Sequence, residues 1–149
     1  MPNILHRLTI DAPPARVQEL VATSEGLGSW WTGRPVGGDD TVGGKLSFYF
    51  SDPDDAAATF EVLEREHDRV VWRCVAGPDS WLDTRVTFTL TPREDGGTTM
   101  LFSHAGWREE SEFMHGCSTN WGAYLMSLKS GAEGSGFTAY PAGEISRWS

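Results

Sequence analysis

Hydrophobic and polar side chains alternate along the start of the chain, and this period-two pattern predicts a first strand. One face of the strand carries Ile4, His6, Leu8 and Ile10. Prolines at positions 13 and 14 follow, where the missing N–H of Pro suits the first turn of a helix. Apolar residues then recur at helical spacing, which predicts a short amphipathic helix through Val17, Leu20 and Val21.

Two glycines, Gly26 and Gly28, end this helix ahead of two adjacent large aromatic residues. Neighbouring side chains of a strand point to opposite faces, so Trp30 and Trp31 cannot both face a core from a simple strand. We expect them in a second helical turn or in a loop. Exposed apolar residues from Trp30 to Pro35, and in the C-terminal tail, would mark either a homodimer contact or the lid of a cavity.

A strand and turn rhythm occupies the middle of the chain. Five runs are rich in β-branched and aromatic residues, namely 45–50, 59–65, 69–76, 82–91 and 98–105. Strong turn formers such as Gly77 with Pro78 separate the runs, and short links favour antiparallel neighbours. With the first strand they predict a meander of about six or seven strands. Gly43 and Gly44, just before the first run, are expected to form a β-bulge that bends the sheet.

The predicted sheet is apolar on one side only, as antiparallel sheets that pack against a single layer are. Its inner face carries Leu46, Phe48, Phe50, Val86, Phe88, Leu90, Met100, Phe102 and His104. The covering layer is a long C-terminal helix. Its apolar stripe consists of Phe113, Cys117, Trp121, Tyr124, Leu125 and Leu128. Glu109, Glu110 and Glu112 lie at its start, and we expect Gly131 to end it.

The length of 149 residues predicts one domain with one core. We expect residues 1–131 to form that core and residues 132–149 to form a C-terminal tail. Four large apolar residues of the tail predict that part of it docks on the body. They are Phe137, Tyr140, Ile145 and Trp148.

Lys and Arg total 12 against 21 for Asp and Glu, so the net charge of −9 disfavours nucleic acid and anionic membrane surfaces as partners. No secretory signal is visible from Met1 to Ile10, and no apolar run approaches the roughly 20 residues of a membrane helix. Cys74 and Cys117 both lie in hydrophobic settings, and two thiols in a chain of this length make no disulfide framework. We therefore expect a cytoplasmic protein with reduced, buried and inert thiols.

The order of these elements resembles the family named after the activator of the Hsp90 ATPase, within the START-like or Bet v 1-like (SRPBCC) superfamily. The motifs that carry the resemblance are the pair Trp30 and Trp31, Gly43 with Gly44, Ser103 to Gly106, and Trp121 with Leu125 and Leu128. Each motif alone is weak, but their order and spacing together are fairly specific, and they cover nearly the whole chain.

The resemblance implies a helix-grip fold of the α+β class, in which a bent antiparallel sheet wraps the C-terminal helix and leaves an elongated cavity. Relatives range from lipid carriers to polyketide cyclases and co-chaperone domains, so the fold assigns no chemistry by itself. The eukaryotic co-chaperone carries an additional N-terminal domain, whereas the pattern here begins at about Ile4. An Hsp90-type chaperone therefore stays a candidate partner, but we do not expect its activation to follow from the family name.

Heavy aromatic loading, with seven Trp and seven Phe, is typical of apolar ligand sites and also of ordinary filled cores. We expect a ligand cavity between the sheet and the C-terminal helix. Its candidate lining residues are Trp31, Phe48, Phe50, Trp72, Arg73, Phe88, Phe102, His104, Trp121 and Leu125. For Arg73 strand alternation is ambiguous, and if it were buried beside His104 it would favour an anionic ligand.

His104, near the end of the last strand, is the one weak catalytic candidate. It would either move a proton near neutral pH or, as the more frequent case, hold the strand-to-helix corner through a satisfied hydrogen bond. The same structural role is expected for His6, whereas His67 and His115 should be solvated. No H-x-x-x-H, C-x-x-C or H-E-x-x-H spacing occurs, so neither a metal nor a cofactor is expected.

Three functions follow from these observations. The first is binding of a small hydrophobic or aromatic molecule without covalent chemistry. The second is an enzyme of polyketide cyclase or hydrolase type that uses the same cavity, with His104 as the proton-transfer group. The third is a protein-interaction domain that acts on a chaperone.

Overall fold

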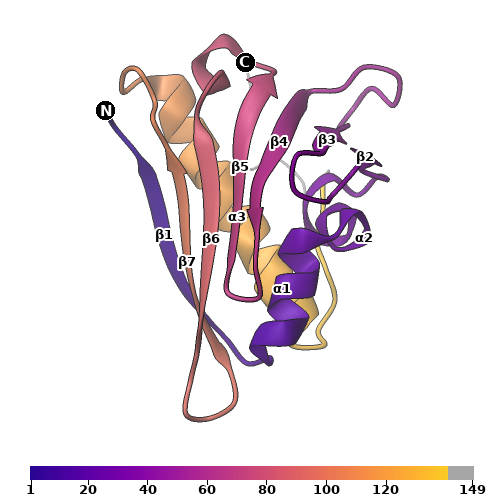
Figure 1. Ribbon diagram of the computed structural model, residues 1–149. Coiled ribbons are helices and arrows are strands. Elements are labelled where there is room, and N and C mark those ends of the chain that lie inside the picture. The colour runs from indigo at the N-terminus through magenta and orange to yellow at the C-terminus, as the bar shows by residue number, and fades with distance from the viewer. Residues whose placement is uncertain (141–149) are drawn as a thin grey trace.

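A seven-stranded antiparallel sheet curves around one long helix in the computed structural model of the protein, which describes residues 1–140 (Figure 1). The strands are β1 (Ile4–Ile10), β2 (Gly37–Gly38), β3 (Lys45–Phe48), β4 (Ala58–Arg65), β5 (Arg69–Ala76), β6 (Arg85–Pro92) and β7 (Thr98–Ala105). Their order across the sheet is β1-β7-β6-β5-β4-β3-β2, and every neighbouring pair is antiparallel. The predicted meander and the helix-grip fold are therefore confirmed.

The long helix is α3 (Glu112–Ala132), which crosses the concave side of the sheet diagonally (Figure 1). Two short helices, α1 (Pro14–Ala22) and α2 (Ser24–Leu27), follow β1 and pack against each other. Their close approach depends on Gly26, since a Cβ there would lie 2.5 Å from the carbonyl oxygen of Glu19.

The tryptophan pair lies in a π-helical turn, η1 (Gly28–Thr32), which confirms the expected second helical turn. Both indoles are buried, Trp30 with 0% and Trp31 with 2% of its surface exposed. The Trp30 N–H donates a 2.8 Å hydrogen bond to the carbonyl oxygen of Leu20. The π-helical turn directs both rings into the core, so these two residues give the segment 30–35 no exposed apolar surface for a dimer contact or a lid.

The sheet bends through irregular pairing inside β4 and β5. The register between these strands shifts at Thr59/Phe60 and again between Val62 and Glu64. Gly43 and Gly44 both pair with Val62 of β4: the Gly43 N–H donates to the Val62 carbonyl oxygen at 2.9 Å, and the Val62 N–H donates to the Gly44 carbonyl oxygen at 2.9 Å. Two residues thus lie opposite one, and Gly43 has the left-handed φ of 87° that such a bulge requires, so the β-bulge expected at this pair is confirmed.

Helix α3 begins at a side-chain cap and runs past its predicted end. The Ser111 hydroxyl accepts a 3.2 Å hydrogen bond from the Met114 N–H. Gly131 lies within the last turn instead of ending the helix, and a Cβ there would lie 2.0 Å from the ring of Phe137. Gly131 thus makes room for an aromatic side chain of the segment that follows the helix.

That segment returns along the body of the molecule. The Tyr140 N–H donates to the carbonyl oxygen of Trp31 at 2.8 Å, and the Thr138 N–H donates to the Ser127 hydroxyl at 2.8 Å. Thr138 and Tyr140 therefore hold this segment against the body of the molecule. The predicted contacts of Ile145 and Trp148 lie outside the described residues.

Candidate functional site

The interior between sheet and helix is filled with aromatic rings. The ring of Trp31 lies 4.5 Å from that of Phe48 and 4.7 Å from that of Trp121, and Phe102 lies 4.7 Å from Trp121 on its other side. Trp72, Phe88 and Leu125 are also buried. A void of about 10 Å³ remains beside Trp31 and Trp121, which is room for one water molecule at most. Most of the predicted cavity residues are thus brought together, but as a packed core.

His104 is fully buried in this core and uses both ring nitrogens. Its Nδ1 accepts a 3.1 Å hydrogen bond from the Trp121 indole N–H, so Nε2 carries the proton and donates to the Thr84 hydroxyl at 2.8 Å. That hydroxyl donates in turn to the carbonyl oxygen of Trp81. Burial lowers the pKa of His104 to about 3, so the ring is neutral at physiological pH. The arrangement matches the structural role expected for this residue, and His104 lines none of the pockets described below.

Arg73 points away from the core. It forms ion pairs with Glu61 at 3.2 Å and with Asp83 at 2.9 Å, and the hydrogen bond to Glu61 is the main reason why its pKa is raised. Its neighbours Trp72 and Cys74 point inward and are buried, so alternation along β5 places Arg73 on the outer face. Arg73 therefore does not lie beside His104. The condition under which we expected an anionic ligand is not met.

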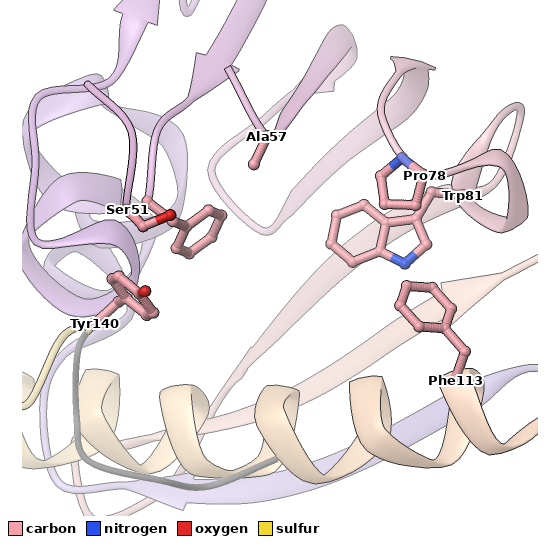
Figure 2. Close-up of a pocket in the computed structure, with 7 residues that line it drawn as sticks. Ser51, Ala57, Pro78, Trp81, Phe113 and Tyr140 are labelled. Carbon is pink, nitrogen blue, oxygen red and sulfur yellow. The ribbon is translucent and has the colours of Figure 1, made fainter. Parts of the chain in front are cut away.

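An open pocket lies at one end of the helix, next to the packed core. Its volume is about 340 Å³, and it is lined by Phe50, Ser51, Ala57, Pro78, Trp81, Phe113 and Tyr140. Figure 2 shows Ser51 and Tyr140 on one side, Trp81 and Phe113 on the other, and α3 running beneath them. The lining comes from the loop after β3, the loop between β5 and β6, the start of α3 and the docked tail.

The two walls of the pocket are held in different ways. Trp81 ends a short 3-10 helix, η2 (Asp79–Trp81), and only 1% of its surface is exposed. Burial raises the pKa of the neighbouring Cys117 thiol to about 11, and the Trp81 side chain lowers it by a smaller amount. On the opposite wall the rings of Tyr140 and Phe50 meet edge to face at 5.3 Å. One wall is thus fixed to the core and the other is formed partly by the docked tail.

Of the cavity residues predicted from the sequence, Phe50 lines this pocket, Arg73 lies on the outer face of the sheet, and the others form the core behind the pocket. The prediction missed Ser51, Ala57, Pro78, Trp81, Phe113 and Tyr140 as lining residues. Most of them lie in loops or in the tail, where strand alternation gives no information on direction. A usable signal was a large aromatic residue, Trp81, within three positions of the strong turn Gly77 and Pro78.

Within residues 1–140 no group of three or more His, Cys, Asp or Glu side chains is arranged to hold a metal ion. Cys74 and Cys117 are free and buried, as predicted. Among the described helices none has the length and apolar character needed to cross a membrane.

Comparisons with known proteins agree with this fold. The family model described as "Activator of Hsp90 ATPase homolog 1-like protein" matches residues 11–133. The solution structure of the Aha1 dimer from Colwellia psychrerythraea is 33% identical, with a TM-score of 0.79 over 91% of this chain and 98% of that one. Protein SSP2350 from Staphylococcus saprophyticus is 17% identical, with a TM-score of 0.74 over 93% of this chain and 97% of that one.

CalU16 from Micromonospora echinospora shares the fold at 22% identity, with a TM-score of 0.71 over 89% of this chain and 75% of that one. A search of curated proteins gave no match. The family model spans most of the sequence, and the likeness to the Colwellia psychrerythraea structure extends over nearly all of both chains. The chain therefore belongs to the family of activator of Hsp90 ATPase homolog 1-like proteins.

Proposed function

We propose that the protein binds a small hydrophobic or aromatic molecule in the open pocket at the start of α3. The observation that carries this proposal is the pocket's lining, in which four aromatic rings and two further apolar side chains surround a single serine. A volume of about 340 Å³ falls in the lower part of the ~300–1,000 Å³ typical of small-molecule sites. Apolar walls with few polar groups are the usual composition of such sites.

The shape of the interior limits the size of the ligand. Behind the pocket the core leaves only the void of about 10 Å³ beside Trp31, so a long acyl chain cannot extend along the helix without displacing packed rings. Opposed aromatic walls, with Trp81 and Phe113 facing Tyr140, favour a flat molecule of one or two rings.

An enzyme of cyclase or hydrolase type is supported less well. His104 lies outside the pocket, is fully buried and has both ring nitrogens engaged. Among residues 1–140, Ser51 and Tyr140 are the lining residues with side-chain hydroxyls, and no carboxylate or imidazole lines the pocket with them. A general acid and base pair needs two titratable groups within reach of the substrate. Binding without covalent chemistry is therefore the simpler function.

Self-association is a second proposal, because the Colwellia psychrerythraea relative is described as a dimer. Two leucines on the outer face of the sheet, Leu5 with 70% and Leu101 with 49% of their surface exposed, flank a shallow groove of about 440 Å³. A second copy of this chain would cover them. Sedimentation analysis of wild type and Leu101→Glu tests this: a dimer that the variant converts to monomer supports the proposal, and a wild-type monomer at all concentrations rejects it.

A chaperone partner rests on the family description alone. It is tested by a pull-down with an Hsp90-type chaperone under conditions that retain a control client. Capture of the chaperone would support this role, whereas an empty pull-down beside a retained client would reject it.

The binding proposal is tested by purification under native conditions followed by denaturation and mass spectrometry of any released small molecule. Titration of the empty protein with naphthalene derivatives by isothermal calorimetry provides the second arm. A stoichiometric copurifying compound, or saturable binding of a two-ring compound, is the expected result. An empty protein that binds none of them would overturn the proposal and direct attention to protein partners.

A further inference from the structure

We infer that the pocket selects ligands that carry a positive charge beside their aromatic part, such as aryl-alkyl amines, and rejects the matching carboxylates. This inference rests on the proposed function, since it concerns the same pocket. It is carried by the carboxylates that stand next to the lining residues along the chain, in three separate segments.

Carboxylates flank every loop that lines the pocket. Those within three positions of a lining residue are Asp52, Asp54, Asp55, Asp79, Asp83, Glu110 and Glu112. No Lys or Arg occurs within the same distance of any described lining residue. Since Lys and Arg total 12 in the chain, their absence from these stretches of sequence is a local feature and not a lack of basic residues.

Part of this negative charge is already compensated. Asp83 is paired with Arg73 at 2.9 Å, and Glu110 lies 3.8 Å from the imidazole of His115, which compensates its charge only when the imidazole is protonated. The other carboxylates at the mouth, those of Asp52, Asp54, Asp55, Asp79 and Glu112, belong to exposed residues. They add about five negative charges beside the lining segments, and these charges are only weakly screened at low salt.

Two positive features oppose these charges. The guanidinium of Arg108 donates to the backbone oxygen of Asp79, and the N-terminus of α3 contributes roughly half a positive charge at Ser111 and Glu112. Together they amount to about one and a half charges, so the negative charge predominates at the mouth. A cleft with low-dielectric walls and one sign of charge concentrates ligands of the opposite sign.

The walls favour the same class of ligand. The rings of Phe50, Trp81, Phe113 and Tyr140 line the pocket, and the faces of such rings attract an ammonium group. An aromatic amine would thus place its ring between the walls and its charge toward the carboxylates. A carboxylate of the same size would meet repulsion at the mouth and gain nothing from the ring faces.

The test compares three ligands with the same ring: naphthylethylamine, naphthylethanol and naphthylpropionate. Calorimetry is performed at about 10 mM and about 1 M salt, where the Debye length is about 30 Å and 3 Å. We expect the amine to bind on the order of tenfold more tightly than the propionate at low salt, with the alcohol between them, and the ratio to fall to about twofold at high salt.

A charge-removal variant locates the effect. In Asp54→Asn/Asp55→Asn/Glu112→Gln the low-salt ratio should fall to about threefold while the affinity for naphthylethanol stays unchanged. The control is Glu66→Gln/Asp68→Asn/Glu94→Gln, which removes the same charge from turns at the opposite end of the sheet (Figure 1). This control should keep the wild-type ratio.

Each outcome has one meaning. Equal binding of amine and propionate by a protein that binds the alcohol overturns the charge selectivity and leaves the proposed function intact. An equal loss of selectivity in the control variant also overturns it, because net charge and not the mouth would then be responsible. If none of the three ligands binds at either salt concentration, the proposed function itself fails.

Discussion

The indole N–H of Trp121 donates a hydrogen bond to Nδ1 of His104 at 3.1 Å, which joins the middle of α3 to β7. From His104 the hydrogen bonds continue through the Thr84 hydroxyl to the backbone oxygen of Trp81. Helix, sheet and the loop that carries one wall of the pocket are thus linked by a chain of polar contacts, each with a defined donor and acceptor. The position of Trp81 depends on this series of hydrogen bonds.

The first prediction concerns the stability that these hydrogen bonds provide. His104→Leu leaves the buried Trp121 N–H without its acceptor and removes the donor to Thr84, so we expect the free energy of unfolding to fall by about 2–4 kcal/mol. Urea denaturation measures this. His115→Leu, at a site whose side chain is 62% exposed, is the control and should change stability by under about 0.5 kcal/mol. A similarly small loss of unfolding free energy in both variants would contradict this prediction.

The second prediction concerns acid. The pKa of His104 is lowered to about 3 in the folded protein by burial, against about 6.5 in an unfolded chain. Between these values the unfolded state binds the extra proton, so the stabilisation is fully present above pH 6.5 and is lost as the pH falls toward 3. The slope of the free energy of unfolding against pH should approach about 1.4 kcal/mol per pH unit from His104 alone. His104→Leu should remove this contribution to the slope.

The useful pH range for that experiment is about 5 to 6.5. The pKa values of Asp39, Asp95 and Glu133 are lowered by hydrogen bonds to their carboxylates, and the stabilisation from such groups is lost only below about pH 4.5. Burial also lowers the pKa of His6, so His6→Gln is measured in parallel. Identical pH profiles for wild type and His104→Leu would refute the prediction.

The third prediction concerns the end of α3. Gly→Ala inside a helix usually stabilises by about 0.5–1 kcal/mol, but a Cβ on Gly131 would lie 2.0 Å from the Phe137 ring. We therefore expect Gly131→Ala to give no gain or a loss in wild type and to give the usual gain in a Phe137→Ala background. A double-mutant cycle in urea should show a coupling of about 1 kcal/mol. Additive effects would show that the two residues do not meet.

The fourth prediction concerns the thiols. Burial raises the pKa of Cys74 and of Cys117 to about 11, and the thiolate is the reactive form. Neither thiol should react with Ellman's reagent at pH 8 in the native protein, whereas both should react at once in denaturant. Rapid labelling of Cys117 in the native protein would show that the core beside Trp81 opens. This result would contradict the inference that this wall of the pocket is fixed.

The fold could be predicted from the sequence because each element has one strong periodic signal. The alternation through Val86, Phe88 and Leu90 and the helical stripe of α3 both reflect a single buried face, and the structure buries both. Boundaries were less predictable. Gly131 has the residue type of a helix end, but its actual role depends on Phe137, a contact that forms only when the tail folds back.

The site was harder to predict than the core. Aromatic residues on strands identify the inner face, but sequence does not show whether they leave space or fill it, and Trp31 fills it from a π-helical turn. The open volume lies where loops and the tail meet, at Pro78 and Tyr140. In such segments the direction of a side chain depends on how the folded chain packs around it. It does not follow from the spacing of residues in the sequence.

If the pocket beside Trp81 holds a small aromatic ligand, a change in its wall should weaken binding. Ala57→Trp places a large side chain into the pocket while keeping the backbone N–H that donates to Phe48 at 2.8 Å. Thr91→Trp, at an exposed position of β6, is the matched control. Neither change should alter the fold, which circular dichroism checks.

The decisive measurement is the calorimetric affinity for naphthylethanol of wild type, Ala57→Trp and Thr91→Trp. We predict saturable one-to-one binding by wild type and Thr91→Trp, and a loss of at least about tenfold in Ala57→Trp, because the added indole takes up much of the free volume. Equal affinity in all three proteins would place the ligand elsewhere and contradict the account.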